Sequence, residues 1–98
     1  MAEKTHEEID GYMEKANVPG SEDGNFYEAH YMDIMGNYVK KEDSKLILLR
    51  IFEANSAELL FEDILYNDKP DIVARFFRHN DLPEVFENYA KTLKGGKK

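Results

Sequence analysis

The sequence predicts an all-α protein, a compact orthogonal bundle of five to six short helices. Apolar residues recur every three or four positions over most of the chain, which is the spacing of one helix face. Four segments also begin with a capping box, in which a Thr, Asn or Asp precedes a Glu by three residues. These boxes are Thr5–Glu8, Asn25–Glu28, Asn55–Glu58 and Asp81–Glu84. Short polar turns separate the segments, and helices this short and numerous favour an orthogonal over an up-and-down bundle.

The densest apolar stretch of the chain runs from Leu46 to Phe52, where only Arg50 is polar. A helix that is apolar all round is buried, and so is a strand with two apolar faces. Both alternatives therefore make this stretch the core. Its leucine content and its lack of Val and Thr favour the helix.

In the first half, the box at Thr5 predicts a helix that ends near Asn17, with an apolar stripe at Ile9, Tyr12, Met13 and Ala16. The box at Asn25 predicts a second helix of about four turns. Its stripe consists of Tyr27, Tyr31, Ile34, Met35 and Tyr38. A stripe rich in Tyr and Met is either half-buried core or an adaptable surface for a partner.

In the second half, the box at Asn55 predicts a helix with the stripe Ala57, Leu60, Phe61, Ile64 and Leu65. Asp68 is expected to cap the next helix, with Ile72, Val73, Phe76 and Phe77 facing inward. The box at Asp81 predicts a last helix, which Gly95 and Gly96 end. We expect residues 1–94 to form a single helical domain and residues 95–98 a disordered basic tail.

Length and composition indicate a small globular protein. The chain has 98 residues, of which 42% are hydrophobic and 34% charged, and it contains no Cys. No apolar run approaches the roughly 20 residues that span a bilayer. The polar, acidic N-terminus does not resemble a signal peptide. We therefore expect a cytoplasmic protein without a membrane partner.

The net charge of −7 is distributed unevenly. Residues 1–43 carry eleven acidic and four basic side chains, whereas residues 44–98 carry nine of each. A concentrated acidic field steers a basic partner, so we expect a protein that binds a basic protein surface as an adaptor, inhibitor or accessory subunit. The expected contact residues are Glu22, Asp23, Glu28, Tyr31 and Asp33. The acidic excess of residues 1–43 is also compatible with an alternative function. The protein would then be a nucleic-acid-mimicking inhibitor of the phage type, which would occupy the basic groove of a DNA- or RNA-handling enzyme.

Two further alternatives rest on shorter patterns. The segment Glu7 to Glu28 resembles the entering helix and loop of an EF-hand, although Pro19, Glu22 and Gly24 depart from the pattern. This resemblance implies a degenerate EF-hand-like lobe that does not bind calcium. Lys69, Arg75 and Arg78 form a basic strip that suits contact with phosphate, but the acidic chain argues against direct binding of nucleic acid.

No spacing in the sequence supports catalysis or metal binding. The three His residues, His6, His30 and His79, lack the short spacings of zinc and di-iron motifs. The Ser and Thr residues occur outside nucleophile motifs, and no Gly-rich phosphate loop is present. We therefore expect neither an enzyme nor a cofactor.

Overall fold

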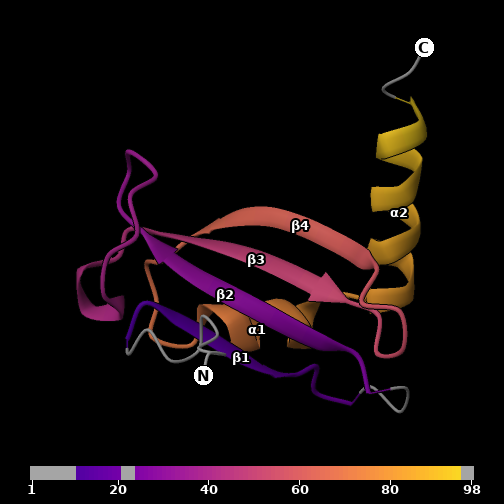
Figure 1. The fold of residues 1–98 in the computed structure, drawn as a ribbon, viewed down its shortest axis with the longest axis horizontal. Helices are drawn as coiled ribbons and strands as arrows, with labels where there is room; N and C mark the ends of the chain where they lie inside the picture. The colour runs from indigo at the N-terminus through magenta and orange to yellow at the C-terminus, as the bar shows by residue number, and fades with distance from the viewer. Residues whose placement is uncertain (1–10, 21–23, 96–98) are drawn as a thin grey trace.

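The computed structural model describes residues 11–20 and 24–95, which form a four-stranded antiparallel sheet and two α-helices (Figure 1). The prediction of an all-α helical bundle is therefore wrong, and the fold is α+β. The strands are β1 (Met13–Asn17), β2 (Phe26–Met32), β3 (Leu46–Phe52) and β4 (Leu59–Tyr66). A 3₁₀ turn, η2 (Lys41–Asp43), precedes β3, and the helices α1 (Ile72–His79) and α2 (Leu82–Gly95) follow β4.

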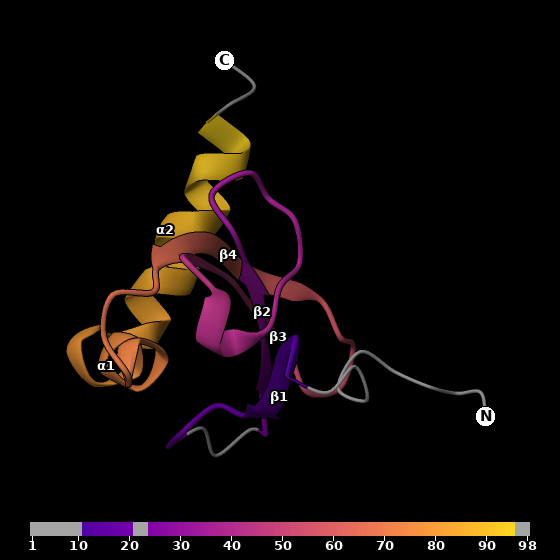
Figure 2. The same cartoon turned by 90° about the vertical axis from the view of Figure 1, so that its left-hand side faces the viewer.

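The strands lie side by side in the order in which the chain makes them, β1-β2-β3-β4. Each neighbouring pair is antiparallel, and β2 opposes β3 along its whole length, from Phe26 opposite Phe52 to Met32 opposite Leu46. Both helices lie on one side of the sheet, and α2 extends past β4 (Figures 1 and 2). Neither of the two described helices covers the opposite face of the sheet (Figure 2).

β3 coincides with the densest apolar stretch, so the strand alternative for these residues is correct and the preferred helix is wrong. Ile47, Leu49 and Ile51 are buried, and the residues between them are half-buried on the opposite face. This alternation has the period of a strand. Ile47 and Ile51 are β-branched, and Arg50 is in phase with the less buried face. Both features favour a strand, whereas the leucine content of the stretch favours a helix.

The main core lies between the sheet and α1. Ala29, Tyr31 and Ile47 are buried there, and Ile72 and Val73 of α1 pack against them. Aromatic rings extend this contact: the ring centroids lie 5.0 Å apart for Tyr27 and Phe77, and 5.3 Å apart for Phe61 and Phe76. Phe61 also meets Tyr89 edge-on at 5.8 Å, which anchors α2 beside the start of β4.

The two helices predicted for the first half are contradicted where the structure describes them. Met13–Asn17 is β1, and residues 5–10 of the predicted first helix lie outside the described residues. Tyr27 and Tyr31 are four residues apart, which places them on one face of a helix but equally on one face of a strand. They belong to β2, where Ala29 lies between them on the same buried face.

The predicted capping box at Asn55 is a turn between β3 and β4, so the helix expected behind it is also wrong. One carboxylate oxygen of Glu53 accepts hydrogen bonds from the backbone N–H of Asn55 and Ser56 and from the Ser56 hydroxyl, at 2.7–2.9 Å. These bonds, led by the Ser56 N–H, hold the pKa of Glu53 below its usual value. Ala57 completes the turn with φ +59°, the left-handed conformation.

The two helices expected at the C-terminal end are confirmed. In α1, Ile72, Val73, Phe76 and Phe77 pack inward as predicted, although the helix begins after Asp71 rather than Asp68. In α2, Asp81 Oδ1 accepts a hydrogen bond of 3.2 Å from the Glu84 N–H, as the capping box requires.

The last helix is longer than predicted. It runs through Gly95, so this residue is helical rather than part of a tail, and residues 96–98 lie outside the described range. Neither described helix combines the length and the apolar character needed to cross a membrane.

Candidate interaction surface

The candidate surface is built around residues 33–38, here called the Asp33 loop, which leaves the end of β2. Asp33 Oδ1 accepts hydrogen bonds from the backbone N–H of Met35 at 2.9 Å and of Asn37 at 3.0 Å. The Asp33 N–H donates to the Asn37 carbonyl at 2.9 Å, and Gly36 makes the turn with φ +88°. These bonds hold the pKa of Asp33 below its usual value, with the Asn37 N–H as the largest cause. The ionised carboxylate therefore organises the loop.

The Asp33 loop presents large apolar side chains to solvent. Met35 is 81% exposed and Ile34 75% exposed, the two highest values among the large hydrophobic residues that the structure describes. Tyr38, at the other end of the loop, is also exposed, and its ring stacks on the buried ring of His30 at 5.7 Å between centroids. His30 Nε2 in turn lies 3.0 Å from Glu28 Oε1. The loop is therefore tied to β2 at both ends.

The structure separates the contact residues that the sequence suggested. Asp33 and Glu28 both support the Asp33 loop, Asp33 from within it and Glu28 through His30 and Tyr38. Tyr31 is only 2% exposed, so its expected position at the surface is wrong. Glu22 and Asp23 lie outside the described residues.

Tyr31 instead belongs to a polar cluster beneath α1. Its pKa is raised strongly, first by burial and then by a hydrogen bond with Glu14. Lys41 Nζ lies 3.1 Å from Glu14 Oε2 and 5.7 Å from the centre of the Tyr31 ring. Burial and the charge of Glu14 also raise the pKa of Tyr27. Both tyrosines therefore keep their protons at physiological pH, and Glu14 and Lys41 form an ion pair beside them.

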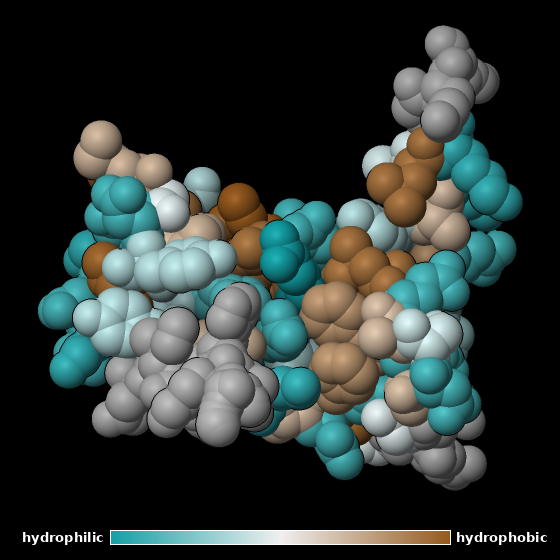
Figure 3. Space-filling view, viewed as in Figure 1, coloured by the Kyte–Doolittle hydropathy of each residue, from teal (hydrophilic) through white to brown (hydrophobic). Residues whose placement is uncertain are grey.

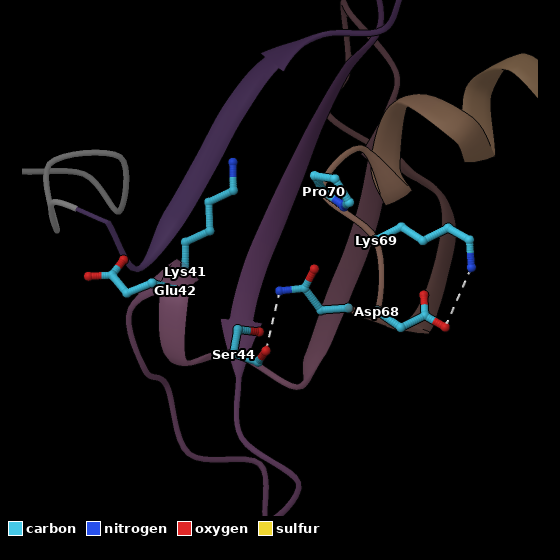
Figure 4. Close-up of a pocket in the computed structure, with 7 residues that line it drawn as sticks. Lys41, Glu42, Ser44, Asp68, Lys69 and Pro70 are labelled. Carbon is cyan, nitrogen blue, oxygen red and sulfur yellow. Dashed lines mark hydrogen bonds and ion pairs between the residues drawn. The ribbon is translucent and has the colours of Figure 1, made fainter.

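This cluster lines a cavity of about 260 Å³ between the sheet and the start of α1, which adjoins a wider, open one of about 570 Å³. Figure 4 shows that the lysines of the wider cavity point in different directions, and Lys69 Nζ lies 3.9 Å from Asp68 Oδ2. Asn67 Nδ2 donates to the Ser44 carbonyl at 3.4 Å. Because these polar groups pair with each other, the cavities present no concentrated charge that would select one class of ligand.

The basic strip is largely neutralised by acids of the chain itself. Arg75 Nε lies 2.8 Å and Arg78 Nη2 3.3 Å from the carboxylate of Asp71. The hydrogen bond from Arg75, followed by the one from Arg78, holds the pKa of Asp71 below its usual value. The third residue of the strip, Lys69, lies beside Asp68. This arrangement does not favour the strip as a binding site for phosphate.

The EF-hand interpretation fails because the segments on either side of residues 18–25 are the strands β1 and β2 rather than helices. In the part of the chain that the structure describes, no group of three or more His, Asp or Glu side chains is placed to hold a metal ion.

Comparison with protein-family models, curated proteins and solved structures finds no match to this chain. The composition of the Asp33 loop contains a signal that the sequence analysis missed, because Asp, Gly and Asn at positions 33, 36 and 37 are residues that favour turns. The apolar residues between them, Ile34 and Met35, also fit the spacing of a helix stripe, so the turn is not evident from the pattern alone.

Proposed function

We propose that this chain is a non-catalytic cytoplasmic protein that binds a partner protein through the Asp33 loop. The observation that carries the proposal is the exposure of Ile34 and Met35 on a loop whose backbone is held by the Asp33 carboxylate. Binding residues are often found on loops that a rigid scaffold positions. A pre-organised loop also loses less conformational entropy when it binds, so its apolar side chains contribute more to affinity.

The expected partner has an apolar pocket surrounded by basic residues. Ile34 and Met35 would fill the pocket, and methionine adapts well to pockets of irregular shape. The acidic excess of residues 1–43 would attract the basic rim and increase the association rate. Glu22 and Asp23 remain predicted contributors to this field. Asp33 has a different role, because its carboxylate builds the loop.

The test begins with the full chain as bait in an extract of the native host, followed by measurement of the affinity for the captured protein. The variant Ile34→Ser with Met35→Ser should weaken binding by tenfold or more, since exposed anchors of this kind carry much of an interface's energy. Leu93→Ser is the matched control, because Leu93 is exposed on α2, far along the chain from the Asp33 loop. Equal loss in the control, or no loss in the double variant, would contradict the proposal.

The electrostatic part has a separate test. Glu22→Lys with Asp23→Lys should slow association at low salt by roughly tenfold and have little effect at high salt, where charges are screened. If DNA competes with this chain for the captured partner, the partner's basic surface is a nucleic-acid groove, and the nucleic-acid-mimicking inhibitor becomes the better description.

A further inference from the structure

The outer edge of β4 is a second exposed feature of the fold and is separate from the Asp33 loop. Within the described sheet, β4 pairs only with β3. The Asn67 N–H donates to the Lys45 carbonyl at 2.9 Å, which identifies Lys45 and Asn67 as a hydrogen-bonded pair of this ladder. Because such pairs alternate along antiparallel strands, Glu62, Ile64 and Tyr66 direct their N–H and C=O groups away from β3.

The two faces of this edge carry different side chains. Ile64 is 51% and Tyr66 74% exposed, and both project from the face of the sheet turned away from α1, where hydrophobic surface is visible over the strands (Figure 3). Asp63 projects from the opposite face, because it pairs with Leu49, and it is also exposed. An exposed edge beside apolar side chains is a template for another strand.

The edge is acidic along its length. Residues 58–68 carry four acidic side chains and no basic one. Within the sheet, Arg50 of β3 pairs with Glu62, with Arg50 Nε 2.7 Å from Glu62 Oε2. Asp63, in the middle of β4, takes part in none of the ion pairs that the described residues form. Its carboxylate is therefore the charge on this edge that a cationic side chain from outside can neutralise.

The position of the Asp63 carboxylate determines which strands this edge accepts. Asp63 Oδ1 accepts a hydrogen bond of 2.8 Å from the outward Ile64 N–H, so the carboxylate lies where an added strand would pair. Opposite charges across two strands stabilise their pairing and like charges oppose it. The carboxylate therefore repels an acidic strand, including a second copy of this chain with its net charge of −7. A Lys or Arg opposite Asp63 instead attracts the carboxylate and frees the Ile64 N–H for the carbonyl of the incoming strand.

We propose that β4 binds an extended segment of a partner protein in which basic and apolar residues alternate, and that this segment adds an antiparallel strand to the sheet. Successive side chains of a strand point to opposite faces, so an apolar residue opposite Ile64 places a basic residue opposite Asp63. Main-chain hydrogen bonds supply affinity in this mode of binding, and the alternating side chains supply specificity. The antiparallel direction matches every strand pair of the described sheet and is the slightly more stable one.

The probe is a short synthetic peptide of alternating lysine and valine, titrated into the full chain while the hydrogen exchange of individual amides is measured. The peptide should protect the Ile64 amide from exchange, and its binding should weaken as salt rises. A peptide of alternating glutamate and valine should not bind. A peptide with the same lysines and valines, but with the lysines grouped at one end, should leave the Ile64 amide unprotected. An Ile64 amide that the alternating peptide leaves unprotected, or that the grouped peptide protects equally, overturns the proposal.

Two matched comparisons test the register. Asp63→Asn keeps an oxygen that can accept from the Ile64 N–H but removes the charge, and it should weaken binding of the alternating peptide by about fivefold. Asp43→Asn removes the same charge from the exposed η2 and should leave binding unchanged.

The second comparison alters the peptide backbone instead. Methylating the valine amides removes the N–H groups that face β4 and should abolish binding, whereas methylating the lysine amides blocks only the outer edge of the peptide. Equal binding of the two methylated peptides, or of the two Asp variants, contradicts the proposal.

Discussion

Leu49 offers the sharpest test of the core. It is fully buried in β3, and its cross-strand neighbours are Ala29 of β2 and Asp63 of β4. Replacing Leu49 by Ala removes a buried side chain at a site where Ala29, also fully buried, has no volume with which to fill the gap. Substitutions of this kind cost about 2–5 kcal/mol, depending on how far the site collapses. With a neighbour this small, we expect about 3 kcal/mol.

The assay is thermal or urea unfolding, followed by circular dichroism. In a domain of this size, 1 kcal/mol changes the melting temperature by about 4–8 °C, so Leu49→Ala should lower it by about 12–24 °C. Leu93→Ala makes the same chemical change at a side chain that is 56% exposed, and it should cost less than about 1 kcal/mol. A decrease of less than about 4 °C in Leu49→Ala, or an equal one in the control, would show that the packing described for β3 is wrong. Leu49→Asp should abolish cooperative folding altogether, since it buries an unpaired charge.

The melting temperature should be the same in millimolar calcium as in chelator. A ligand that binds only the folded state stabilises it, so a rise of several degrees with calcium would contradict the strand assignment on either side of residues 18–25. The pKa values of Asp33, Glu53 and Asp71 are lowered in the folded chain, so in acid the unfolded chain binds more protons than the folded chain does. The free energy of unfolding should therefore be constant near neutrality and fall as the pH drops below about 4. Asp33→Asn should reduce that fall. Tyr31→Phe should lower the free energy of unfolding by about 1 kcal/mol, because it removes the hydrogen bond with Glu14. The effects of Tyr31→Phe and Glu14→Gln, measured by urea unfolding, should not add. Additive effects would refute the contact.

The sequence predicted the candidate surface only in part. The charge of Asp33 predicts a contact residue, and the stripe that contains Ile34 and Met35 indicates either half-buried core or a contact surface. The structure gives Asp33 another role, since its carboxylate accepts hydrogen bonds from the loop backbone. The sequence also predicts Tyr31 as a contact residue, but the period of a strand turns its side chain into the core. Its role could not be predicted without first knowing whether the segment is a helix or a strand.

The sequence alone determined which stretch is buried and where the last two helices lie. Leu46 to Phe52 is apolar enough to be core in any fold, and the capping residue Asp81 satisfies a backbone N–H at the start of α2 within its own turn. Only the tertiary structure decided that Met13–Asn17, Phe26–Met32 and Leu59–Tyr66 are strands. A spacing of four residues fits one face of a helix and one face of a strand, so the pattern could not distinguish them. The hydrogen bonds that settle the choice join residues distant in sequence, such as the Tyr31 N–H and the Tyr12 carbonyl at 3.0 Å, and they exist only once the neighbouring strands are in place.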